Sequence, residues 1–199
     1  MLRRLHPLIV FCLFVAAAVL LAAVGPREKS LGANVRLVYL HGAWVWTALV
    51  GFGAAAAAGL VGLLGRRPAW QRTSVALGQS AALFWITYLP MSLLVMQANW
   101  NGLFLEEPRF RIGLNFAIVA VLLQLGILIL RRPDWASALN LLFLVGLAFS
   151  LSTSREIMHP GSPIAQSGSV LLEAYFLLLT LTCLAAGWQF TRWLRRFTP

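Results

Sequence analysis

Two histidines are the side chains of this sequence best suited to bind a metal ion. His41 lies in the segment YLHGAWVW (residues 39–46), and His159 lies in the segment IMHPGSP (residues 157–163). Zinc usually takes three or four protein ligands, and no third His or Cys lies in the connections that we assign to the same side of a membrane. Two imidazoles instead suit the axial positions of a haem iron.

Several charged residues are candidates to support such a site. Haem carries propionate carboxylates, and the planar guanidinium of arginine pairs well with a carboxylate. Arginines in the same connections could bind the propionates or contact lipid headgroups: Arg36, Arg109, Arg111 and Arg155. Glu173 is ionisable and lies near the start of an apolar segment, so it is a candidate to pair with an arginine, to orient an imidazole or to reach the interface.

The elements that must position these residues are transmembrane helices. Hydrophobic residues make up 60% of the chain, charged residues 11%, and the mean hydropathy is +0.80. Soluble domains carry roughly 25% charged residues, so the composition indicates a membrane protein. The net charge of +10 comes from arginines between apolar runs, a pattern that does not indicate nucleic-acid binding.

Six segments are apolar enough to span a bilayer, and they predict one all-α, polytopic domain. The predicted spans are 5–24, 37–64, 73–98, 112–130, 135–152 and 169–191. Residues 51–62 are rich in glycine and alanine, which is typical of close helix packing. The short connection at 131–134 predicts an antiparallel hairpin of the fourth and fifth helices.

The arginines predict the orientation. With the N-terminus in the cytoplasm, ten Lys and Arg side chains lie inside and six lie outside, as the positive-inside rule requires. An even number of helices puts both termini in the cytoplasm, with the first helix retained. The outer loops are then 25–36, 99–111 and 153–168, so His41 and His159 are expected on the same outer face.

The order of these features resembles a family of cytochrome c biogenesis proteins, the haem exporter protein C type. That family has six spanning helices and a second helix beginning approximately YxHVPxAW, which His41 and Trp46 match with the same spacing. A tryptophan-rich segment follows the third helix and a further external histidine precedes the sixth, where this chain has Trp100 and His159.

Two departures make the chain a divergent member of that family. The family's central segment reads approximately WGxWWxWDxR, and an ungapped match places Trp100, Glu107 and Arg109 on its first Trp, its acid and its Arg. The other tryptophans are replaced by Leu103, Phe104 and Glu106. Ala43 replaces the usual proline.

The resemblance implies a non-covalent b-type haem on the outer face, with His41 and His159 as axial ligands. The residues expected around it are Trp46, Trp100, Arg109, Arg36 and Glu107. Haem would pass to other membrane subunits of cytochrome c maturation in a bacterial or archaeal inner membrane. No catalytic residue is implied, so we expect a haem-handling protein and not an enzyme.

Two other functions remain open from the sequence. One is an electron-transfer membrane subunit with a permanent bis-His haem, and the other is a permease-like partner subunit without a cofactor. An enzyme is the least supported class, because the sequence has no nucleophile–base pair, phosphate-binding loop or HExxH motif.

Overall fold

The computed structural model describes residues 6–155, 162 and 164–198. Within these residues the protein is all-helical and has six helices, each long and apolar enough to cross a membrane. They are α1 (Pro7–Val24), α2 (Val35–Leu64), α3 (Pro68–Trp100), α4 (Pro108–Leu130), α5 (Pro133–Thr153) and α6 (Val170–Leu194). The predicted six-helix, multi-pass membrane fold is confirmed.

Proline is the first residue of four helices, and two of these helices begin earlier than predicted. α1, α3, α4 and α5 each begin with proline, which has no amide hydrogen to lose at the first helical position. α3 therefore begins at Pro68 and not at 73, and α4 begins at Pro108 and not at 112. Arg109 and Arg111, predicted in a loop, belong to the first turn of α4.

The N-terminus of α2 also differs from the prediction. This helix begins at Val35, two residues before the predicted boundary, so Arg36 lies in its first turn and not in a loop. The connection between α4 and α5 is as short as predicted, and these two helices form a hairpin.

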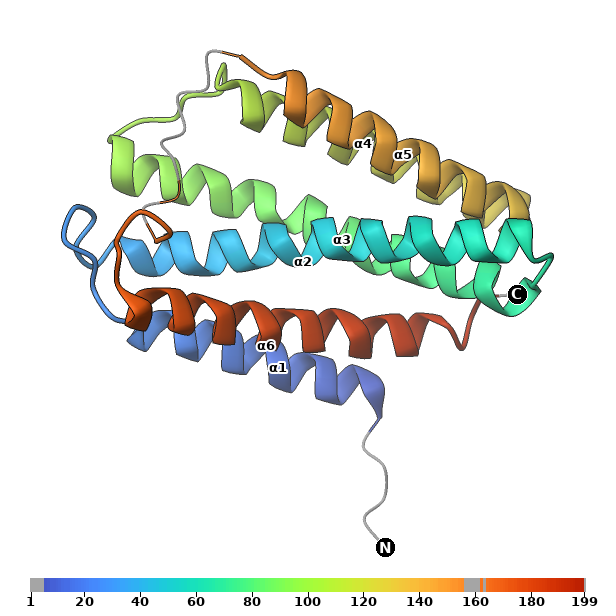
Figure 1. Ribbon diagram of the computed structural model, residues 1–199, viewed down its shortest axis with the longest axis horizontal. Helices are drawn as coiled ribbons and strands as arrows, with labels where there is room; N and C mark the ends of the chain where they lie inside the picture. The colour runs from blue at the N-terminus through green and yellow to red at the C-terminus, as the bar shows by residue number, and fades with distance from the viewer. Residues whose placement is uncertain (1–5, 156–161, 163, 199) are drawn as a thin grey trace, which may run out of the picture.

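The six helices form three pairs, stacked as layers (Figure 1). α2 and α3 make the central pair, α4 and α5 lie on one side of it, and α1 and α6 lie on the other. The chain therefore places the first and last helices side by side. The central pair contributes most of the buried aromatic core, which includes Phe52, Phe84 and Trp85.

Small residues hold the central pair together, as the glycine- and alanine-rich tract predicted. A Cβ atom on Gly51 would lie 2.9 Å from Cβ of Ala81, so α2 and α3 approach as closely as their backbones allow. A Cβ on Gly59 would lie 2.9 Å from both Oγ of Ser74 and the carbonyl oxygen of Ser137. Such contacts are typical of helix packing in lipid.

Polar side chains add hydrogen bonds between the layers. Ser74 Oγ donates to the Ala55 carbonyl at 2.7 Å, which links α3 to α2. Asn140 of α5 donates from Nδ2 to the Ser74 carbonyl at 3.0 Å. Ser80 donates to the Gly187 carbonyl of α6 at 3.0 Å. In an apolar medium these bonds satisfy buried groups that water cannot reach.

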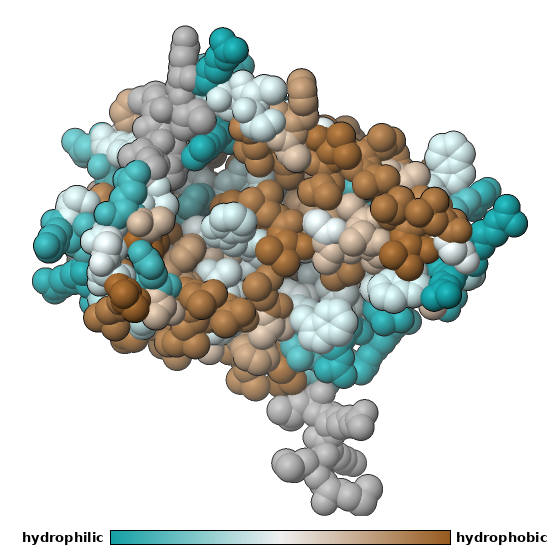
Figure 2. Space-filling view, viewed as in Figure 1, coloured by the Kyte–Doolittle hydropathy of each residue, from teal (hydrophilic) through white to brown (hydrophobic). Residues whose placement is uncertain are grey.

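Both ends of the bundle are hydrophilic, and an apolar band separates them (Figure 2). One end carries the connections 25–34 and 101–107 and the start of α6, and we call it the histidine end. The other carries the connections 65–67 and 131–132 and the end of α6, and we call it the arginine end after Arg66, Arg67, Arg131, Arg132, Arg195 and Arg196.

The packing of Gly59 predicts a large difference between two glycines of α2. Gly59→Ala should destabilise the protein by about 1–3 kcal/mol, because the new methyl group collides with the backbone of α5. Gly53→Ala is the matched control, since its Cβ would meet no atom within 4 Å. Alanine is the better helix former, so this control should be neutral or stabilising. Apparent melting temperatures in detergent test the difference, and equal temperatures for the two variants would contradict it.

Candidate functional site

His41 is the predicted iron ligand that the structure describes. It is the seventh residue of α2 and so lies within the helix. Its side chain is partly buried. Its Nδ1 lies 3.4 Å from Oγ of Ser92 on α3, and its ring centroid lies 5.8 Å from that of Tyr88. The imidazole is therefore oriented by α3, the helix against which α2 packs most extensively.

Tyr88 connects His41 to α4. Its phenol is buried and its oxygen lies directly against Gly113, where no side-chain atom would fit. Trp85, one turn earlier, donates from Nε1 to the Gly113 carbonyl at 3.1 Å. The absence of a side chain at Gly113 thus lets two aromatic residues of α3 contact the backbone of α4.

Glu107 is the most buried of the predicted site residues that the structure describes, with 2% of its surface exposed. Its Oε2 accepts a hydrogen bond from the Phe110 amide at 2.7 Å and so caps the N-terminus of α4. Its Oε1 is buried and has no hydrogen-bond partner within the described part of the chain.

His41, Tyr88 and Ser92 form a group of polar and aromatic contacts at the histidine end, which we call the His41 cluster. Of its members, only His41 was predicted from the sequence. The sequence did not identify Ser92 and Tyr88 as site residues, because they lie in a long apolar helix.

Two aromatic residues, Trp46 and Trp100, were also predicted to lie around the haem. Trp46 is 53% exposed, because five residues after His41 correspond to roughly 140° around a helix. Trp44, three residues from His41, faces α3 instead and donates from Nε1 to Oγ1 of Thr87 at 2.8 Å. The helical spacing to His41 could have identified Trp44 as the residue on the same face. Trp100 is the last residue of α3, and its ring packs edge-on against Phe104 at 5.6 Å.

The predicted cations occupy different surroundings. Arg36 donates from Nε to the Gly25 carbonyl at 3.0 Å and so closes the connection between α1 and α2. Arg111 pairs with Glu106 at 2.6 Å, and both side chains are largely exposed. Arg109 is exposed in the first turn of α4, and Arg155 is exposed beyond the end of α5. Glu173 is the fourth residue of α6, as predicted, and is exposed.

The second predicted ligand, His159, lies outside the described residues. The chain after it is described again from Ile164, apart from Ser162. Ile164 is buried in one cluster with Tyr39 and Ala43, which lie two residues before and two residues after His41. Two residues correspond to about 200° around a helix, so Ile164 packs on the face of α2 that is turned to α1 and α6, and His41 lies on the opposite face.

The burial of Glu107 predicts that two adjacent glutamates contribute differently to stability. Glu107→Ala should lower the free energy of unfolding by about 1–2 kcal/mol, because the Phe110 amide loses its cap. Glu106→Ala removes only a surface ion pair and should cost less than about 1 kcal/mol. Thermal unfolding in detergent compares the two. A larger loss for Glu106→Ala would show that the cap does not hold α4.

No family model matches the sequence, and no curated protein gives a significant match.

Proposed function

We propose that the protein binds haem at the histidine end of the bundle and hands it on during cytochrome c assembly. The observation that carries the proposal is the position of Ser92 beside Nδ1 of His41. A contact at Nδ1 helps to orient the imidazole ring, and we propose Nε2 as the nitrogen that binds the iron. His41 with Ser92 fits the arrangement expected of an oriented axial ligand.

His159 is the proposed second axial ligand. Ile164 is fixed beside Tyr39 and Ala43, and five residues of chain span at most about 17 Å. We propose that the chain before Ile164 passes around α2, so that His159 reaches the opposite face, which carries His41.

Other residues at the histidine end are the proposed partners for the remaining parts of haem. Arg109 is an exposed guanidinium at the same end and is the proposed propionate partner. Arg36 is the weaker candidate, because it already donates to the Gly25 carbonyl. Trp100 and Phe104 form the aromatic pair at the end of α3, where the resembled family has its tryptophan-rich segment. Haem is the cargo here, so the chain needs no catalytic group of its own.

The place of action proposed is the outer face of a bacterial or archaeal inner membrane. The arginine end carries the denser positive charge, and the positive-inside rule assigns it to the cytoplasm. The histidine end then faces outward, where other membrane subunits of cytochrome c maturation would take the haem.

One observation favours a second function. His41 lies within α2, two turns from its start, and ligands on helices are typical of electron-transfer subunits that keep their haem. Such a subunit would retain haem through purification and reduce it reversibly with a quinol. A haem-handling protein would lose haem readily to an acceptor protein.

The proposed ligands predict a specific pattern of haem binding. Purified protein reconstituted with haem should show a low-spin bis-His absorption spectrum. His41→Ala and His159→Ala should each abolish that spectrum, and Ser92→Ala should weaken binding about 10- to 100-fold by releasing the imidazole.

His6→Ala is the matched control. His6 caps α1 through Nδ1, which accepts from the Leu8 amide at 3.3 Å, and it lies at the start of α1, at the other end of that helix from the connection to α2. Its loss should leave the spectrum unchanged. Failure of the wild-type protein to bind haem on reconstitution would refute the proposal and favour a permease-like subunit without a cofactor.

A further inference from the structure

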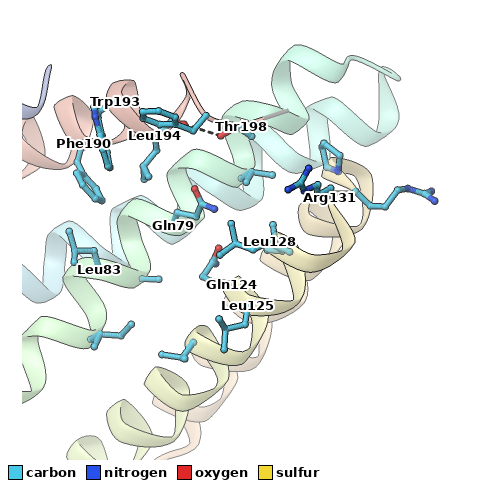
Figure 3. A pocket seen from close by; sticks show the side chains of 18 residues that line it. Gln79, Leu83, Gln124, Leu125, Leu128, Arg131, Phe190, Trp193, Leu194 and Thr198 are labelled. Atoms are coloured by element: carbon cyan, nitrogen blue, oxygen red, sulfur yellow. Dashed lines mark hydrogen bonds between the residues drawn. The ribbon is translucent and has the colours of Figure 1, made fainter. Parts of the chain in front are cut away.

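A large pocket lies at the arginine end, away from the His41 cluster. α4 and α6 each pack against α3 but, within the described residues, not against each other. The space between them is a pocket of about 780 Å³, with α3 as its floor (Figure 3). Its size falls in the range of ligand sites, roughly 300–1,000 Å³.

The lining of this pocket is amphipathic. Most of its wall is aliphatic or aromatic, with Leu83, Leu125, Leu128 and Trp193 among the contributing side chains. The charged and amide side chains of the lining lie at two levels. Arg131 and Arg132 lie where α4 passes into α5, and the amides of Gln79 and Gln124 face each other from α3 and α4 (Figure 3).

The two polar levels are separated along α4. Gln124 precedes Arg131 by seven residues, which corresponds to about 10 Å of helix. Oε1 of Gln124 is buried and lacks a hydrogen-bond partner among the residues described. The pocket therefore offers cations at the membrane surface, an amide level beneath them and apolar walls along its length.

We propose that this pocket binds an anionic phospholipid of the surrounding leaflet. The phosphate would pair with Arg131, and an acyl chain would lie deeper in the pocket, along the leucine wall. Basic pockets between transmembrane helices on the cytoplasmic side are typical sites for such headgroups. The charge of the arginines favours an anionic lipid over a neutral one.

Arg131 is the better of the two arginines for this role. Arg132 already pairs with Asp134, with 2.7 Å between Nη2 and Oδ2. Arg131 adopts a left-handed backbone conformation with φ of 50°, which caps α4 by donating its amide hydrogen to the Ile127 carbonyl.

Native mass spectrometry of the delipidated full-length protein tests the proposal, with phosphatidylglycerol or phosphatidylcholine added to the detergent. Phosphatidylglycerol should bind more tightly to the wild type, and Arg131→Gln should weaken its binding about fivefold while leaving phosphatidylcholine unaffected. Leu128→Trp fills the pocket and should reduce the binding of both lipids.

Arg66→Gln is the matched control. Arg66 also has a left-handed conformation, with φ of 49°, at the same end of the bundle, but it does not line the pocket. Its substitution should not change lipid binding. The proposal is overturned if both arginine variants lose phosphatidylglycerol equally, if phosphatidylcholine binds as tightly, or if a second protein copy occupies the pocket. None of these results depends on haem binding at the other end.

Discussion

The close approach of α2 and α3 is the contact on which the rest of the structure depends. Gly51 and Gly59 bring the two helices together at distances that leave no room for a Cβ atom. In lipid there is little hydrophobic force between helices, so packing of this kind and a few interhelical hydrogen bonds must hold them. The outer pairs then pack on a central pair that is already fixed.

α3 is consequently the helix that serves both ends of the molecule. At the histidine end its Tyr88 and Ser92 contact His41. At the arginine end it forms the floor of the pocket between α4 and α6. Pro90 lies between Tyr88 and Ser92 and removes one amide donor from the helix at the level of the cluster. The two proposed sites are thus positioned by one helix but have no residue in common.

The helical architecture could be predicted almost completely from the sequence. Apolar runs of sufficient length identify the spans, since no other element can satisfy its backbone in lipid. The errors occurred at helix starts, because hydropathy marks where apolar residues begin and not where the helix begins. Pro68 and Pro108 extend α3 and α4 into polar sequence, which moved Arg109 into a helix.

By itself, the sequence determined the number of spans, their packing through small residues and the identity of His41 as a candidate ligand, because these follow from hydropathy, side-chain size and residue chemistry. Only the tertiary structure decided which residues surround His41. Ser92 and Tyr88 come from another helix, Trp44 and not Trp46 lies on the α3-facing side, and Glu107 is buried as a helix cap. The rotation of each helix about its axis sets these neighbours, and near-uniform hydrophobicity around a membrane helix leaves that rotation unmarked in the sequence.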